Sequence, residues 1–286
     1  MLLIGIASAL VASALFNVGI VLQAIDARAA PASMSLRLSL LWRLVHQRRW
    51  VIGFLLGIVG LAPQILAYGE APFVVVQPAL AIGLVIVLVA GERLLGESVG
   101  LAERAGVAAI IGGVALVSWG APSHTEAHRG AVAVVSVAGG LSLVALAPFA
   151  LRATRFDRAM LAIVASGCGF GVANIATKLL GDDFPDHLTN AFVWAVVGVV
   201  MGVAATVTGM TAFQRAAATI VVPVSTAVQT FVPIVLEPLF LRERWGSARL
   251  DGVPLAAGLA LALVGCVLVA RSRAVSGLLA SAAGGS

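Results

Sequence analysis

The sequence predicts an all-α polytopic membrane protein of about nine transmembrane helices, from its composition and from the lengths of its apolar runs. Of the 286 residues, 60% are hydrophobic and 11% are charged, whereas soluble domains carry about 25% charged residues. Mean hydropathy is +1.07 over the whole chain. One crossing takes about 20 apolar residues. A membrane β-barrel would instead alternate polar and apolar residues in short segments, so the runs are predicted to be helices.

Nine apolar runs follow one another along the chain as predicted spans. The first is too long, and lacks the basic start, for a cleaved signal peptide. Residues 34–48, between the first two runs, are too charged to cross and predict an amphipathic helix on the membrane surface, with an ordinary basic loop as the alternative. Residues 271–286 are expected to be a disordered tail. The runs cover 2–24, 50–69, 72–91, 101–120, 130–151, 159–180, 190–213, 216–240 and 252–270.

The distribution of basic residues predicts the orientation of the chain. If residues 25–49 are cytoplasmic, thirteen arginines fall on the cytoplasmic side and four on the outside. This asymmetry follows the positive-inside rule, so the N-terminus is predicted outside and the C-terminus inside, in a bacterial inner membrane. The net charge is +5 and the sequence pI is about 10.5. Because the basic residues lie between apolar runs and form no single surface, no nucleic-acid partner is expected.

An internal repeat is indicated at a shift of about 145 residues, where glycine, proline and glutamate positions coincide. Residues 1–120 form the first copy with four spans, and residues 130–270 form the second copy with five. An odd number of spans separates matching helices, so the copies have opposite orientations. Inverted-topology repeats give many secondary transporters alternating access. The coinciding pairs include Gly53/Gly198, Gly57/Gly202, Pro78/Pro223 and Glu92/Glu237 and, with one further residue of shift, Glu97/Glu243 and Gly106/Gly252.

Two glycine pairs within this repeat predict close helix packing. Gly53 and Gly57 form a GxxxG pattern, and their counterparts Gly198 and Gly202 form a second one. Such small-residue faces let neighbouring helix backbones approach closely.

The motifs of the first copy resemble those of the drug/metabolite transporter (DMT) superfamily. They comprise AYGEAP at 67–72, LGE at 95–97 and the glycine-bearing helix that follows. Within this superfamily the chain is most similar to the NIPA-type magnesium transporters, on its nine spans and on the GxGxG segment that begins at Gly167. The resemblance implies a secondary-type transporter with magnesium or another divalent cation as its first substrate. The alternatives are a transporter of a small organic metabolite and a non-transporting membrane scaffold.

Polar side chains inside the spans are the candidates for a solute pathway, because each is costly in lipid unless it is paired or hydrated. The alternative is that they only hold the helices together through hydrogen bonds, worth about 0.6 kcal/mol each. The pathway is predicted between spans 1, 2 and 3 of the first copy and spans 6, 7 and 8 of the second. The principal candidates are Asn17, Gln64, Tyr68, Gln77, Asn174, Thr177, Lys178 and Gln229.

Two repeat-related carboxylates are candidates for gating or coupling. Glu92 lies near the cytoplasmic end of span 3, and Glu237 lies near the outer end of span 8. The favoured alternative is a helix-end carboxylate paired with a nearby arginine, Arg93 for Glu92 and Arg242 for Glu237.

Four carboxylates fall at the predicted outer ends of spans, and these are the only candidate metal residues. A shared vestibule would concentrate cations, and magnesium is commonly held by one or two carboxylates while it keeps several waters. The alternative is a solvated acidic loop, and Lys178 nearby would equally suit a carboxylate-bearing metabolite. The four residues are Glu70, Asp182, Asp183 and Asp186.

No enzyme is expected. All four histidines lie outside the apolar runs, and the sequence has neither a GxSxG nor an HExxH motif. Cys168 and Cys266 lie among small apolar neighbours and are expected to be packing residues. No cofactor is predicted. The expected partners are the lipid bilayer and a small-molecule or cation substrate, and a homodimer is left open.

Overall fold

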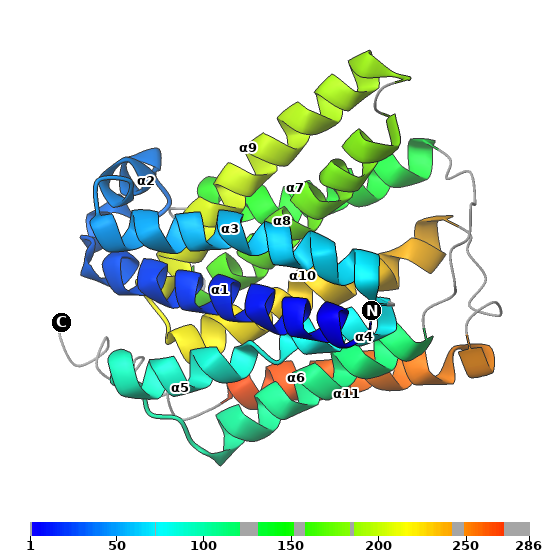
Figure 1. The fold of residues 1–286 in the computed structure, drawn as a ribbon. Coiled ribbons are helices and arrows are strands. Elements are labelled where there is room, and N and C mark those ends of the chain that lie inside the picture. The colour runs from blue at the N-terminus through cyan, green and yellow to red at the C-terminus, as the bar shows by residue number, and fades with distance from the viewer. Residues whose placement is uncertain are drawn as a thin grey trace.

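The computed structural model describes residues 2–71, 73–120, 131–151, 158–183, 186–241 and 249–271, and every regular element in these ranges is a helix (Figure 1). Within these ranges, six helices are long and apolar enough to cross a membrane. The all-helical architecture and these six helices are those expected of a polytopic membrane protein. The predicted tail lies almost wholly outside the described residues.

A helix occurs in each of the nine predicted ranges, and the third range is divided between two helices. The helices are α1 (Leu2–Ala29), α2 (Leu38–Leu44), α3 (Arg48–Glu70), α4 (Phe73–Ala81), α5 (Leu84–Leu94), α6 (Leu101–Gly120), α7 (Ala131–Ala150), α8 (Arg158–Asp183), α9 (Leu188–Phe213), α10 (Ala218–Leu241) and α11 (Val253–Ala270), with short 3-10 turns at Ala32–Met34 and Arg249–Gly252.

The first copy of the repeat packs around α1. Helix α3 lies along α1 and runs antiparallel to it, because Gly53 meets Gly19 near one end while Gly60 meets Phe16 further along. A Cβ added at Gly60 would lie 2.9 Å from Phe16 Cε1. Helix α4 also lies against α1. Figure 1 shows α1 and α3 side by side.

The second copy repeats this arrangement around α8. Helix α9 runs antiparallel to α8, since Gly169 faces Ala205 and Gly209 faces Ser166. Helix α10 lies against α8 as α4 lies against α1. Helices α1 and α8, which take corresponding positions in the two copies, therefore have corresponding neighbours.

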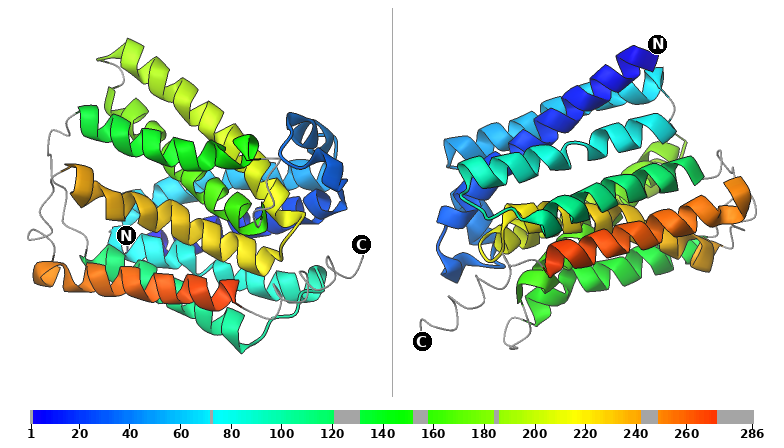
Figure 2. Two further views of the ribbon diagram at one scale, coloured as in Figure 1. Left: turned by 180° about the vertical axis from the view of Figure 1, so that it is seen from behind. Right: turned by 90° about the horizontal axis from the view of Figure 1, so that it is seen from below.

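Helices α6 and α11 join the two copies along a seam of glycines. A Cβ added at Gly113 would lie 2.7 Å from the carbonyl oxygen of Gly258, and one added at Gly106 would lie 2.8 Å from that of Gly265. The pairing shows that the two helices are antiparallel, and they lie side by side in Figures 1 and 2. Only glycine permits backbones to approach so closely.

The predicted GxxxG faces are confirmed at one glycine of the four. Gly53 lies in close backbone contact with Gly19, but Gly57 and Gly202 have no atom within 4 Å of an added Cβ. Gly198 makes only an ordinary contact, at 3.5 Å from Ala176 Cβ. Gly53 and Gly19 meet more closely than the glycines of the α6–α11 seam, which instead form a repeated contact with a spacing of seven residues and not four.

The predicted amphipathic helix over 34–48 is shorter than expected. Helix α2 has seven residues and lies against α9. Leu40 and Leu44 are fully buried, whereas Leu38 and Trp42 are 68% and 73% exposed. The predicted apolar face is therefore divided between the helical bundle and the surface.

Candidate functional site

A break between α4 and α5 interrupts the third predicted span. Pro78 lies inside α4, where it has no N–H to donate and strains the preceding turn. The chain then tightens, with Gly83 N–H donating to Leu80 O at 3.2 Å, and the next helix begins at Leu84. Discontinuous helices within the membrane are typical of transport sites, because they expose backbone groups.

Two polar side chains of α1 lie against this break. Ser13 Oγ donates a hydrogen bond to Leu80 O at 2.6 Å, and Asn17 Nδ2 donates to Ser13 O at 2.8 Å. Both side chains are buried. A Cβ added at Gly83 would overlap Asn17 Nδ2 and Ser13 Oγ, so glycine is required for the polar contact to form.

The second copy packs differently at the corresponding position. The shift of the repeat aligns Gly83 with Val228, and α10 runs unbroken past it from Ala218 to Leu241. Here the glycine lies on the other helix: a Cβ added at Gly167 of α8 would lie 2.6 Å from Val228 Cβ and 2.8 Å from Ser225 O. The break and its polar partners are therefore a feature of the first copy.

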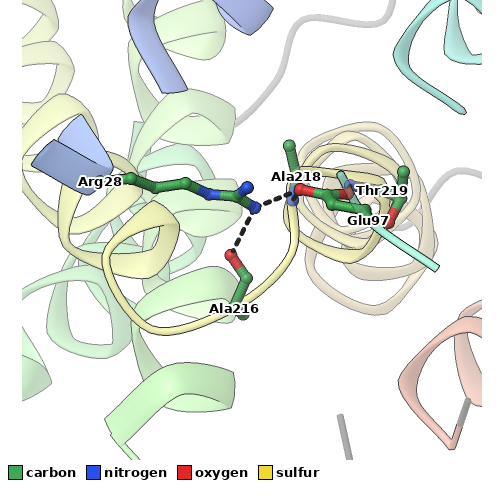
Figure 3. A network of polar contacts seen from close by, with 5 residues as sticks. All are labelled: Arg28, Glu97, Ala216, Ala218 and Thr219. Carbon is green, nitrogen blue, oxygen red and sulfur yellow. Dashed lines mark hydrogen bonds and ion pairs between the residues drawn. The ribbon is translucent and has the colours of Figure 1, made fainter. Parts of the chain in front are cut away.

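A polar network joins the two copies at the end of the bundle where α1 ends, here called the Arg28 end (Figure 3). The Glu97 carboxylate accepts hydrogen bonds from the Arg28 guanidinium, from Ala218 N–H at 2.7 Å and from Thr219 N–H at 2.9 Å. Arg28 Nη2 also donates to Ala216 O at 3.3 Å. The side chain of Glu97 is only 5% exposed and that of Arg28 is 26% exposed.

The local sequence explains how Glu97 reaches the start of α10. Gly96 has φ +64, a conformation that glycine adopts at little cost, and it turns the chain back so that Glu97 N–H donates to Gly91 O at 2.9 Å. Gly91 has no side chain to displace Thr219, whose Cγ2 lies beside it. The carboxylate then satisfies two N–H groups that the first turn of α10 leaves unpaired, and its charge is favourable there.

Further contacts fasten the segment after α1 to the same end. Asp26 Oδ2 accepts a hydrogen bond from Trp50 N–H in the first turn of α3 at 2.8 Å. Ser35 Oγ lies 2.8 Å from Gln214 Oε1, and Leu36 N–H donates to Thr211 Oγ1 at 3.0 Å. The connection between α1 and α3 therefore contacts the end of α9, in the second copy.

The predicted pathway residues lie in different environments. Asn17 lies at the α4–α5 break. Gln64 and Gln229 are half-buried, on α3 and α10. Asn174 and Thr177 of α8 are exposed, and Thr177 Oγ1 donates to the carbonyl of its own helix, at Ala173, at 2.8 Å. The side chains of Tyr68, Gln77 and Lys178 lie outside the described part of the chain.

Of the two repeat-related carboxylates, Glu92 forms an exposed ion pair. Its Oε2 lies 3.7 Å from Nη2 of Arg104, with side chains 52% and 61% exposed. The partner predicted from sequence proximity, Arg93, was wrong, because the start of α6 returns Arg104 to the end of α5. The side chain of Glu237 lies outside the described part.

The predicted outer carboxylates lie at helix ends. Glu70 ends α3 and Asp183 ends α8, both half-buried, and Asp186 is exposed just before α9. No group of three His, Cys, Asp or Glu that could hold a metal ion occurs among the described side chains. The side chain of Asp182 is outside that set, so the four-carboxylate vestibule stays a prediction.

Sequence reasoning missed the role of Arg28 and Glu97. Arg28 entered only as one of the arginines that set orientation, and Glu97 only as part of a motif and as one of the coinciding pairs of the repeat. The available signal was that Glu97 and Glu243 coincide in the repeat, although each lies outside the apolar runs. No protein-family model, curated protein or solved structure matches this chain.

Proposed function

We propose that this chain is a secondary-type membrane transporter that moves a small solute by alternating access between two inverted repeats. The observation that supports it most is the matched packing of the copies: α3 runs antiparallel to α1 as α9 does to α8, and α4 and α10 take corresponding places. Two such copies in opposite orientations can exchange their conformations, which opens a central pathway to each side in turn.

In this proposal all nine helical ranges cross the membrane, with α4 and α5 counted as one span. The Arg28 end of the bundle is cytoplasmic, the N-terminus is outside and the C-terminus is inside a bacterial inner membrane. The α4–α5 break, with Asn17 and Ser13 against it, then lies within the bilayer and contributes to the pathway. This placement agrees with the thirteen arginines on one side and four on the other.

Magnesium or another divalent cation is the first substrate of this proposal. Hard cations prefer oxygen ligands, and the outer ends of α3 and α8 carry Glu70 and Asp183. A small organic metabolite is the second candidate. It is favoured by Lys178, one turn before Asp182 in the sequence, because a fixed positive charge repels cations and attracts carboxylates.

Uptake by proteoliposomes tests the proposal. Purified protein would be reconstituted with a magnesium-sensitive dye inside, and the Glu70→Gln/Asp183→Asn variant would be compared with Asp157→Asn, which removes a carboxylate from the predicted cytoplasmic side. Magnesium uptake that is lost only in the double variant supports a divalent cation. Uptake of a polyamine, amino acid or dicarboxylate, without magnesium uptake, supports the metabolite. If neither magnesium nor any of these solutes is taken up, the transporter proposal is wrong and a non-transporting membrane scaffold is favoured.

A further inference from the structure

The two copies meet along the α6–α11 seam, where α6 also contacts α10, and at the Arg28 end. Helix α1 touches α9, α2 touches α9, and α5 touches α10. In Figure 1 the C-terminal end of α9 comes close to α1, whereas its N-terminal end diverges from α3, and the reverse view in Figure 2 shows the same divergence. Helices of the first copy therefore contact helices of the second copy at the Arg28 end.

We propose that Arg28, Glu97 and the first turn of α10 form a latch that closes the cytoplasmic end of the solute pathway. The bonds that this pair makes to the second copy, from Ala218 and Thr219 N–H to Glu97 and from Arg28 to Ala216 O, must separate whenever the pathway opens to the cytoplasm. The inference rests on the proposed function, and it assigns Arg28 and Glu97 as positioning residues that hold one conformation of the transporter.

The origin of the groups that meet at Glu97 supports this assignment. The carboxylate stands in the α5–α6 connection of the first copy, Arg28 ends the first helix of that copy, and the two N–H groups begin a helix of the second. No rigid motion of one copy relative to the other can leave all these bonds in place. The hydrogen bonds of Glu97 therefore depend directly on the relative position of the two copies.

The network is also built so that it can separate. Arg28 is 26% exposed, so water can reach the guanidinium as it leaves Ala216 O, and released helix N–H groups at such an end can be hydrated. Thr219 Oγ1 is fully buried beside the carboxylate and has no hydrogen-bond partner among the described residues. An unsatisfied buried hydroxyl is costly, and movement of α10 into water relieves that cost.

The exposed pair between Glu92 and Arg104 offers a matched control. It joins the same residue types near the same end of α5 and, like Arg28 and Glu97, within the first copy, but both side chains are more than half exposed and the ion pair includes no group of the second copy. Loss of Arg104 removes an ion pair without releasing any contact between the copies.

Thiol labelling from the cytoplasmic side tests the latch without any substrate. Ser225, about two turns beyond Thr219 on α10 and half-buried, would be replaced by cysteine in a chain that carries Cys168→Ser and Cys266→Ser. A membrane-impermeant maleimide would then be applied to inside-out vesicles. Arg28→Gln and Glu97→Gln should raise the labelling rate several-fold, Arg104→Gln should leave it unchanged, and Arg28→Lys should restore most of the protection.

The outcomes separate the latch from the proposed function. Unchanged labelling in both Arg28→Gln and Glu97→Gln overturns the latch, even if the wild type transports magnesium or an organic solute. Raised labelling in a protein that moves none of the solutes supports the closure and contradicts the transporter. If Glu97→Gln does not give a monodisperse protein, Arg28→Gln decides, because it removes one of three donors and leaves the α10 N–H groups capped.

A reversible lock gives the second readout. Glu97→Cys/Ala218→Cys, which joins the first copy to the second through a reducible bis-thiosulfonate cross-linker, should stop uptake, and reduction should restore it. If the contact is purely structural, the cross-linked protein keeps transporting, and that result overturns the latch.

Discussion

Glu97 receives hydrogen bonds from partners that are 69 and 121 residues away in the chain. Its apolar surroundings are tolerable because one guanidinium and two N–H groups surround the carboxylate, and a buried charge without such partners would be strongly disfavoured. The distance in sequence is also why this network could not be predicted: neither partner shares a motif or a helix face with Glu97. Asn17 could be nominated, because any amide inside an apolar run stands out.

Thr219→Val should stabilise the protein. Valine keeps the methyl group that lies beside Gly91 and removes a buried hydroxyl without a partner among the described residues, a change worth about 1–3 kcal/mol. Thermal unfolding in detergent would show a higher midpoint than that of the wild type. A lower midpoint would mean that the hydroxyl is bonded, and the account of the closed network would have to change.

Gly83→Ala should destabilise the protein by about 1–3 kcal/mol, since overpacking of a tight site forces side chains and backbone to shift. The added methyl overlaps the buried amide of Asn17 and the hydroxyl of Ser13. Gly139→Ala is the control, because nothing lies within 4 Å of its added Cβ and alanine favours the helix by about 0.5–1 kcal/mol. Equal unfolding midpoints for the two variants would show that the polar contact at the break is loose.

At the scale of elements, the apolar runs predicted where helices occur but not how they pack. Nine ranges contain helices because an apolar run of this length can satisfy its backbone in lipid in no other way. The break at Gly83 was not predicted, although Pro78 was noted, because a proline tolerated in one membrane helix breaks another, depending on the side chains beside it. The buried face of α2 was also set by a tertiary partner, α9.

The α6–α11 seam is the element-scale feature most open to test. Gly113→Ala should separate the two helices and lower stability by about 1–3 kcal/mol, because its Cβ meets the rigid backbone at Gly258. The neighbouring Gly112→Ala is the matched control, since its Cβ would lie 3.2 Å from the tip of Leu261, which can move. Unfolding midpoints that fall equally in both variants would contradict the claim that the close backbone contact of the seam requires glycine at position 113.

At the scale of the whole molecule, the two copies of the repeat pack their helices in the same arrangement and contact each other along the antiparallel α6–α11 seam. Sequence could indicate this, because glycine, proline and glutamate coincide where chance matches are few. The differences between the copies could not be read in advance. The α4–α5 break and the Arg28–Glu97 network depend on which side chain of a neighbouring helix faces each position.

The proposed transport mechanism requires that the two copies have opposite orientations in the membrane, and the sidedness of two single cysteines tests this most directly. In a chain with Cys168→Ser and Cys266→Ser, one cysteine would be appended after Ser286 and another would replace Ser123. With opposite orientations, an impermeant maleimide labels the first only from the cytoplasmic side and the second only from outside. Labelling of both from the same side would contradict the proposed mechanism.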